Sequence, residues 1–207
     1  MKRLIIIICV LAVLVSESVL FYYLLQQRQV IYNKNSMIDN LTVKYSTMWQ
    51  QYPLIVSNIG EFVDDAIVVD TLDQEVFLSE YIQKHGGKIM VCRYAELQCQ
   101  ECVNHTISIV ADNKNIFDLS KVLFLPNIQS KRILKLQNRE YNVSDCNVRN
   151  CVDDLNIQAD HISYPYYMVV DSDLRVCGIY APNKSTHGTD FDFKNLKLMY
   201  DNLVDKQ

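Results

Sequence analysis

The chain has 207 residues, of which 49% are hydrophobic and 21% are charged, and its formal net charge is −4. This composition suits one domain of ordinary size plus an additional segment, with enough apolar side chains for a packed core. The sequence has no cluster of lysine and arginine of the kind that marks a nucleic-acid-binding surface, so we expect no nucleic-acid partner.

The N-terminal segment has the pattern of a membrane anchor. Lys2 and Arg3 precede an apolar run, residues 4–25, in which Glu17 is the single charge. About 20 apolar residues cross the hydrocarbon core of a bilayer, and basic residues stay on the cytoplasmic side. We therefore predict a transmembrane signal anchor at residues 1–25, inserted in the membrane through residues 4–25, and export of the remainder.

A cleaved signal peptide is the alternative, with Ser16 and Ser18 as small residues near a possible cleavage site. Both interpretations place the rest of the chain outside the cytoplasm, where disulfides can form and persist. The cysteines of this exported part are Cys92, Cys99, Cys102, Cys146, Cys151 and Cys177.

Residues 26–54 are predicted to form a helical stalk, with a polar linker as the alternative. Residues 26–52 contain neither glycine nor proline, and Pro53 is the expected stop signal. A seven-residue repeat of apolar residues runs through this segment and is interrupted by Lys34. Its members are Ile31, Ile38, Leu41, Tyr45, Met48 and Tyr52.

Residues 55–207 have the pattern of one α/β domain. Runs of β-branched and aromatic residues indicate strands, and apolar residues at helical spacing indicate helices. Ser79 is the expected cap of the first helix, and Gly86 and Gly87 are expected to end it. The expected strands are residues 66–70, 75–78, 88–94, 121–127, 166–171 and 175–180, the first two forming a hairpin, and the expected helices are residues 79–85, 100–111, 130–140 and 192–204.

Cys99 and Cys102 lie between a predicted buried strand, residues 88–94, and the start of a predicted helix, residues 100–111. By spacing alone, such a pair is a redox couple, half of a metal site or two inert thiols. At this junction, however, the free N–H groups and the dipole of the helix stabilise a thiolate at the first cysteine. The one-turn spacing brings the second cysteine close enough to form a disulfide, which favours a redox couple.

Four stretches make the chain resemble the thioredoxin superfamily over roughly residues 60–205 and, within it, the membrane-anchored TlpA/redoxin-like proteins of the bacterial cell envelope. They are "DTLDQEVFLSEYI", "GGKIMVCRY", "CQEC" and "YPYYMVVDSDLRV". The resemblance implies an α/β fold, a thioredoxin-like three-layer sandwich with a central mixed sheet and an N-terminal hairpin. In this interpretation a single transmembrane helix precedes the domain.

The resemblance also implies an activity, that of a thiol–disulfide oxidoreductase of the cell envelope, here expected to act as a reductase. Cys99 would attack a substrate disulfide and Cys102 would resolve the mixed disulfide. Pro165 matches a proline that is cis in the family, and with Tyr164 it is expected to line the substrate groove. The implied partners are a protein disulfide substrate and an upstream electron donor, with no cofactor. The implied location is the bacterial inner membrane, with the domain facing the periplasm.

The chain departs from the family around the motif. Gln98 stands where the family usually has tryptophan, Gln100 and Glu101 replace a Gly-Pro or similar pair, and Leu174 stands near a usual glycine. The charge of Glu101 should raise the pKa of Cys99 relative to a neutral pair, which favours the reducing direction. Peroxidase activity is not expected, because "RYAELQC" lacks the proline and the threonine or serine that peroxiredoxin-like relatives carry.

The remaining cysteines have structural interpretations. Cys92 and Cys177 lie inside predicted apolar strands and are expected to be buried free thiols. Cys146 and Cys151, in "CNVRNC", are candidates for a secondary disulfide, with inert thiols or a metal site as alternatives.

Two other functions stay open. In the first, the domain is a redox-inactive binding or scaffold module in which Cys99 and Cys102 form a structural disulfide. In the second, Cys99, Cys102 and His161 carry Cu(I), which soft thiolates and imidazole suit. His161 is otherwise expected in a solvated loop, and His105 on a helix surface.

Overall fold

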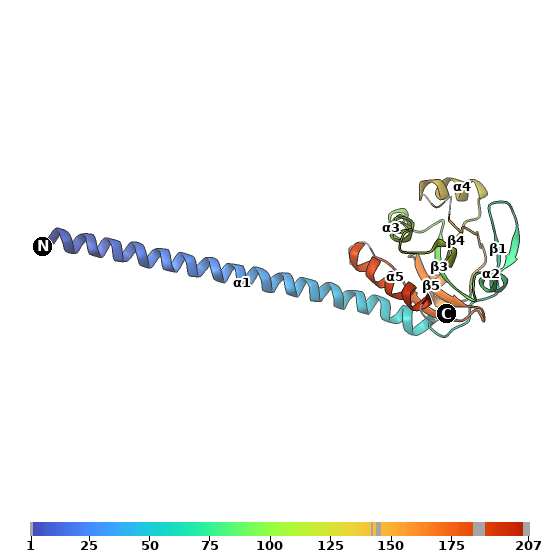
Figure 1. Cartoon of the computed structure of the whole chain (residues 1–207), viewed down its shortest axis with the longest axis horizontal. Coiled ribbons are helices and arrows are strands. Elements are labelled where there is room, and N and C mark those ends of the chain that lie inside the picture. Colours follow the sequence, from blue (N-terminus) through green and yellow to red (C-terminus); the bar gives the residue numbers. More distant parts are fainter. Residues whose placement is uncertain (1, 142, 144–145, 184–188, 205–207) are drawn as a thin grey trace. The chain divides into compact units, whose positions relative to one another are not determined.

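The computed structural model of the chain shows a long N-terminal helix, α1 (Lys2–Asn58), followed by an α/β domain (Figure 1). Contacts between residues divide the chain into two units, residues 1–45 and residues 46–207. The structure describes residues 2–141, 143, 146–183 and 189–204, with side chains from residue 14 onward except at residues 47, 50 and 204.

Within the side chains that the structure describes, no helix combines the length and the apolarity needed to cross a membrane. The side chains of residues 4–13, the first part of the predicted span at residues 4–25, lie outside this described part.

The predicted helical segment at residues 26–54 is helical, but Pro53 does not end it, and α1 continues to Asn58. The contacts of its last turns with the domain explain the continuation. The Gln51 side-chain amide donates to the carbonyl of Ala181 at 2.6 Å and accepts from the N–H of the same residue at 3.1 Å. Leu54 is buried in the core, so these tertiary contacts compensate for the hydrogen bond that proline cannot make.

The domain is built on a four-stranded mixed sheet whose strand order is β4-β3-β5-β6. Strands β3 and β4 are parallel, whereas β5 is antiparallel to both β3 and β6. A separate antiparallel hairpin, β1–β2, precedes the sheet, as predicted. The strands are β1 (Ile67–Val69), β2 (Glu75–Phe77), β3 (Lys88–Ala95), β4 (Val122–Asn127), β5 (Tyr166–Asp171) and β6 (Val176–Tyr180).

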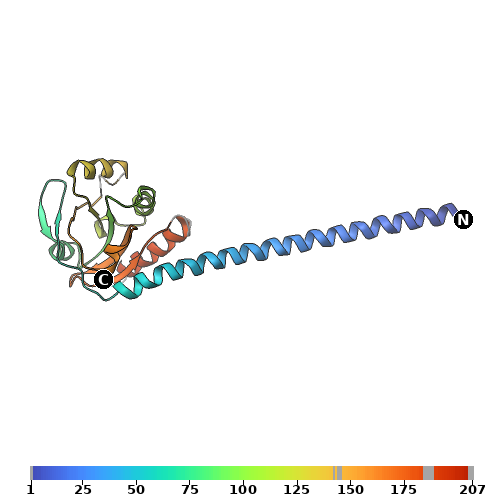
Figure 2. The same ribbon diagram turned by 180° about the vertical axis from the view of Figure 1, so that it is seen from behind.

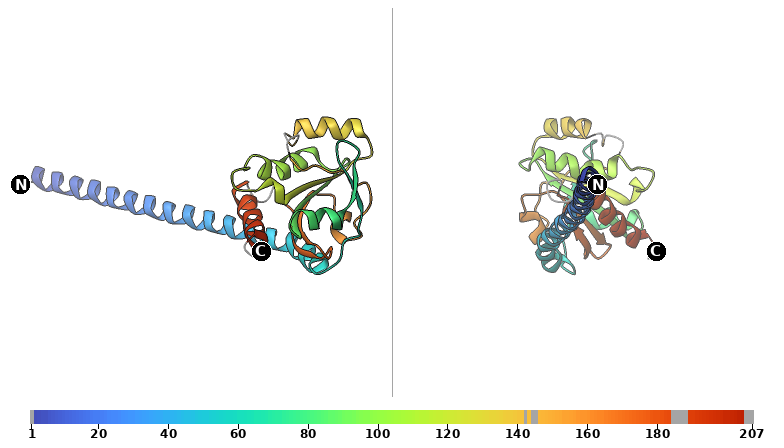
Figure 3. Two further views of the ribbon diagram at one scale, coloured as in Figure 1. Left: turned by 45° about the vertical axis from the view of Figure 1, so that its right-hand side comes forward. Right: turned by 90° about the vertical axis from the view of Figure 1, so that its left-hand side faces the viewer.

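Helices cover both faces of this sheet and complete a three-layer sandwich (Figures 2 and 3). Helices α3, α4 and α5 pack on one face, and α2 with the last turns of α1 packs on the other. The helices of the domain are α2 (Leu78–Lys84), α3 (Gln100–Ala111), α4 (Lys131–Glu140) and α5 (Thr189–Val204), with short 3₁₀ turns at η1 (Leu119–Lys121) and η2 (Gln158–His161).

The central strands are buried on both faces, as their continuous apolar sequences predict. Alternate residues of a strand point to opposite faces. In β3, Met90 and Cys92 therefore join the cluster under α3 and α5, and Ile89 and Val91 join the cluster under α2. Cys92 is fully buried, as predicted, but Cys177 is exposed, because it lies on the edge strand β6.

Ser79 does not cap helix α2, contrary to the prediction. The cap is Asp65, which is distant in sequence. The Ser79 N–H donates to Asp65 Oδ1 at 2.9 Å, and the Ser79 hydroxyl donates to Asp65 Oδ2 at 2.7 Å. At the other end, Gly86 and Gly87 have φ values of 99° and 79°, which end the helix as predicted. Asp65 thus joins the segment before the hairpin to the helix after it.

Replacing Asp65 with alanine should lower the free energy of unfolding by about 1 kcal/mol, because the first turn of α2 loses its side-chain acceptor. Urea titration of the full chain followed by circular dichroism measures this. Asp64→Ala is the control: Asp64 is also exposed, and its backbone N–H, which the substitution keeps, bonds to the carbonyl of Leu155. Equal losses in the two variants would contradict the capping role.

Candidate functional site

Cys99 occupies the N-cap position of α3, immediately after the loop that follows β3. The Cys102 N–H, in the first turn of the helix, donates to Cys99 Sγ at 3.4 Å. A helix begins with N–H groups that have no partner within the helix. The sulfur of Cys99 therefore takes the place that a serine or aspartate oxygen has in an ordinary cap.

The two cysteines of the motif lie in different environments. Cys99 is exposed and Cys102 is partly buried, and both are free thiols. The Cys102 thiol, and then the Cys102 backbone N–H, lower the pKa of Cys99 below its ordinary value. Burial raises the pKa of Cys102 to about 11, and the nearby Cys99 sulfur adds to this rise. The Cys99 sulfur is therefore the more readily deprotonated of the two, and Cys102 is held as a thiol.

Glu101 affects Cys99 in two opposing ways. Its backbone N–H lowers the pKa of Cys99, whereas its negative charge raises it, as predicted from the sequence. The charge is the smaller contribution, so the pKa of Cys99 is lowered overall. The helix start, which is local backbone geometry, outweighs the exposed side-chain charge because the backbone N–H groups contact the sulfur directly.

The loop before Cys99 is ordered by hydrogen bonds and exposes one apolar side chain. Gln98 Oε1 accepts from the N–H of Ala95 at 3.0 Å, and the Gln98 N–H donates to the carbonyl of Ala95 at 3.2 Å. Leu97, between them, is 98% exposed. The sequence carries no sign that an apolar side chain is held in water two residues before Cys99, because the conformation of the turn alone decides its direction.

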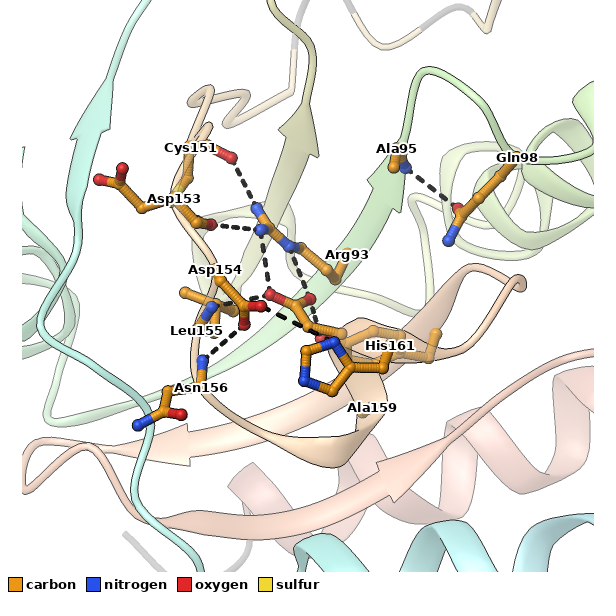
Figure 4. Close-up of polar contacts among 12 residues, drawn as sticks. Arg93, Ala95, Gln98, Cys151, Asp153, Asp154, Leu155, Asn156, Ala159 and His161 are labelled. Atoms are coloured by element: carbon orange, nitrogen blue, oxygen red, sulfur yellow. Dashed lines mark hydrogen bonds and ion pairs between the residues drawn. The ribbon is translucent and has the colours of Figure 1, made fainter.

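A buried ion pair between Arg93 and Asp160 lies next to this loop (Figure 4). The Arg93 guanidinium, near the end of β3, donates from Nε to Asp160 Oδ1 at 3.0 Å and from Nη2 to Asp160 Oδ2 at 3.1 Å. It also donates to the backbone carbonyls of Cys151 and Asp153. Asp160 accepts in addition from the Tyr166 hydroxyl at 2.7 Å. These bonds hold η2 and the segment after Cys151 against the end of β3.

No protein-family model and no curated protein sequence matches the chain. Solved structures are similar in shape. The C-terminal domain of a proposed thiol-disulfide oxidoreductase from Bacteroides thetaiotaomicron superposes with a TM-score of 0.55 and 13% identity, over 73% of this chain and 99% of that one. A thiol:disulfide interchange protein from Bacteroides sp. gives 0.52 and 13%, over 71% and 90%. The thioredoxin domain of a thiol-disulfide oxidoreductase from Bacteroides vulgatus gives 0.51 and 11%, over 69% and 97%.

The domain has a thioredoxin-like fold. At 11–13% identity, the likeness to these structures establishes the fold alone. It confirms the predicted α/β sandwich with a central mixed sheet. In the structure of this chain, Cys99 and Cys102 lie at the junction of β3 and α3.

The predicted groove residues lie next to the end of β3. Strands β3 and β5 pair with Arg93 opposite Tyr166, so the chain just before β5 lies beside the strand that leads to Cys99. The bond before Pro165 is trans, contrary to the resemblance, as the intrinsic preference of X–Pro bonds favours. Tyr164 is half exposed and lines a cavity of about 410 Å³ between α1, η2 and the segment after β6.

The structure does not bring His161 to the two cysteines. His161 is exposed, and its Nδ1 lies 3.8 Å from Asp154 Oδ2, beside the buried ion pair (Figure 4). Among the residues that the structure describes, no group of three metal-ligating side chains could hold a metal ion. The alternative Cu(I) site of Cys99, Cys102 and His161 is therefore wrong. His161 belongs to η2, and the hydrogen bonds between Asp160 and Arg93 hold η2 in its place.

The predicted disulfide between Cys146 and Cys151 is not formed, since Cys151 is a free thiol. The two residues pack into different core clusters. Cys146 contacts the cluster under α3 and α5, and Cys151 lies in the cluster under α2. The four residues between them in sequence cross from one face of the sheet to the other, where Val148 bridges to Phe124 of β4.

His105 is buried, contrary to its predicted place on a helix surface. Its Nε2 lies 2.8 Å from Asp192 Oδ2, and the Tyr180 hydroxyl donates to Asp192 Oδ1 at 2.6 Å. Helix α5 covers the side of α3 that carries His105, and Asp192 of α5 is the partner of this histidine. The sequence of α3 alone carries no sign of this, because the partner lies on a helix far along the chain.

The Arg93–Asp160 pair predicts a pH dependence of stability. Burial raises the pKa of Asp160, but the Arg93 hydrogen bonds and charge outweigh it and hold that pKa below its usual value. A carboxylate with a lowered folded-state pKa stabilises the fold above its unfolded pKa of about 3.9. This stabilisation is lost as the pH falls through the folded pKa.

Asp160→Asn should lower the free energy of unfolding at pH 7 by about 3–5 kcal/mol, because it leaves the buried Arg93 charge without a counterion. The loss should shrink as the pH falls from about 4 toward the lower folded-state pKa, because the carboxylate is then protonated first in the unfolded and then in the folded chain. Urea titrations across this range measure both. Asp154→Asn, at an exposed neighbouring carboxylate, should cost less than about 1 kcal/mol. A similar cost for the two variants would refute the role of the pair.

The two pKa shifts of the motif predict unequal alkylation. In the reduced full chain, Cys99 should react with iodoacetamide at pH 7 faster than an ordinary cysteine, whose pKa is about 8.5. Cys102 should react only as the pH approaches 11. Cys177 is the control, because it is an exposed residue like Cys99. Partial burial of its thiol and the Asp171 charge raise its pKa. Peptide mapping by mass spectrometry gives the three rates, and a Cys99 rate no higher than that of Cys177 would contradict the assignment.

Proposed function

We propose that the thioredoxin-like domain is a thiol–disulfide oxidoreductase that reduces disulfides of other proteins through Cys99 and Cys102. The observation that carries the proposal is the asymmetry of the pair at the start of α3. An exposed sulfur with a lowered pKa precedes a partly buried thiol with a raised one by a single helical turn. This is the arrangement that an attacking and a resolving cysteine require.

The reaction begins with both cysteines as thiols. Cys99 loses its proton to solvent, and its thiolate attacks one sulfur of the substrate disulfide, whose second sulfur leaves as a thiolate and takes up a proton. The Cys102 thiol is then deprotonated and attacks Cys99 Sγ, which breaks the mixed disulfide and releases the second substrate thiol. The substrate has gained two electrons, and the domain is left with a Cys99–Cys102 disulfide.

A second dithiol protein must reduce the Cys99–Cys102 disulfide before the next turnover. We propose the reducing direction because the Glu101 charge, although the other contacts of Cys99 outweigh it, makes the Cys99 thiolate less stable than a neutral residue at position 101 would, and a less stable thiolate makes a dithiol a better reductant. The exposed Leu97 supports a polypeptide substrate, since it offers apolar contact area beside the nucleophile.

The cellular setting is part of the proposal. The basic start and the apolar run at residues 4–25 support a membrane anchor with the domain in the bacterial periplasm. They also support a TlpA-like membership of the superfamily. In that compartment, a reductase needs a donor that brings electrons from the other side of the membrane.

Trapping tests the proposal. In cells, Cys102→Ser should accumulate mixed disulfides through Cys99 with substrate proteins, because the resolving thiol is missing. Cys99→Ser is the matched control and should accumulate none. With purified full chain, dithiothreitol and insulin, the unmodified chain should accelerate insulin reduction, and Cys99→Ser should lose this activity.

If neither variant traps a partner, and insulin is reduced no faster than by dithiothreitol alone, the oxidoreductase proposal fails. The domain would then be a redox-inactive binding or scaffold module. In that case both substitutions would act only through stability.

A further inference from the structure

Residues 31–59 carry a seven-residue repeat, and most of its members make no contact with the domain core. The repeat has two series, which we call positions a and d, and together they define the stalk stripe. Eight of its nine positions are apolar, compared with six of the twenty other positions in this range. The a positions are Ile31, Ile38, Tyr45, Tyr52 and Ile59, and the d positions are Lys34, Leu41, Met48 and Ile55.

All eight apolar side chains of the stalk stripe are exposed, from 38% at Ile55 to 61% at Tyr45. The last turns of α1 contact the domain through other positions, Gln51, Leu54 and Asn58. Ile55 and Ile59 line a cavity together with residues of β6 and α5, so the last part of the stripe faces the domain. The rest of the stripe, from Ile31 to Tyr52, is a second apolar surface of α1, different from the one that packs on the domain. A long helix gains most of its stability from packing of an apolar face, so a partner for the stripe is required.

We propose that residues 31–52 of α1 pair with the same residues of a second copy of this chain as a parallel, two-stranded coiled coil. Apolar residues at a and d over three heptads are the pattern of such an assembly. Isoleucine at a, with leucine at d, favours two strands over three or four. Residues Ile31, Ile38 and Leu41 provide this combination.

The flanking positions favour the parallel orientation. The residue just before an a position is called g, and the residue just after a d position is called e. In a parallel pair, a g residue of one helix faces the e residue five positions further along the other helix. Here these are Lys44 and Trp49, and the Trp49 side chain is 67% exposed. Each Lys44 ammonium can then lie over the indole of the other copy, a favourable cation–π contact that occurs twice by symmetry. In an antiparallel pair, these two residues would not meet.

The length of the stripe is sufficient for a stable pair. Residues 31–52 extend over about 32 Å of helix at 1.5 Å per residue. Lys34 is the one charged member, and in a parallel pair the two copies of Lys34 occupy the same layer. A single polar residue of this kind fixes the register at some loss of affinity.

The test is the number of chains per particle for the purified full chain in a mild detergent, measured by sedimentation equilibrium with dithiothreitol present to exclude disulfides. Two chains are expected. Leu41→Asp should weaken the dimer by more than about tenfold, because it places a charge in the contact layer. Val43→Asp is the control: it adds the same charge to an exposed apolar residue two positions along, outside the stripe. Lys34→Leu should strengthen the dimer.

A monomeric or trimeric chain would overturn the proposal, as would a Val43→Asp variant that weakens the dimer as much as Leu41→Asp. Helicity measured by circular dichroism at high protein concentration distinguishes loss of pairing from loss of the helix. The result is independent of the redox proposal, since none of these substitutions touches Cys99 or Cys102.

Discussion

The ion pair between Arg93 and Asp160 is the interaction on which the site end of the domain depends. Arg93 is 2% exposed on a strand that is buried on both faces. Its charge is tolerated there because one carboxylate and two backbone carbonyls accept its hydrogen bonds. A buried pair of this kind contributes little net stability compared with apolar packing. Its consequence here is position, because it holds η2 and the start of β5 against the end of β3.

The chemistry of the motif follows from position along a single helix. Cys99 lies at the helix start, where backbone N–H groups lack partners, and Cys102 lies one turn further, where burial begins. Two identical side chains thereby acquire pKa values that are shifted in opposite directions. The surrounding fold supplies what the helix cannot, namely the fixed loop that exposes Leu97 and the adjacent strand end at Tyr166.

Helix α1 has two separate apolar surfaces. One ends in Leu54 and packs in the core of the domain, where it belongs to the same cluster as residues of α2, β3 and β5. The other, the stalk stripe, is exposed throughout. The apolar repeat in the sequence does not by itself say whether its partner is the same chain or another one. The hydrogen bonds of Gln51 with Ala181 and of Asn58 with Ala159 show which surface of α1 packs on the domain of the same chain.

The sequence by itself determined the strands, the helices and the position of Cys99 and Cys102 at a helix start, because these depend on local patterns: continuous apolar runs, helical spacing, and the junction of a strand and a helix. Only the tertiary structure decided the features that depend on partners distant in sequence. Asp65 caps α2, Asp192 pairs with His105 in the interior, and Cys146 and Cys151 lie on opposite faces of the sheet. In each case the local residues allowed more than one outcome, and the free energy of packing and of satisfying buried polar groups selected one.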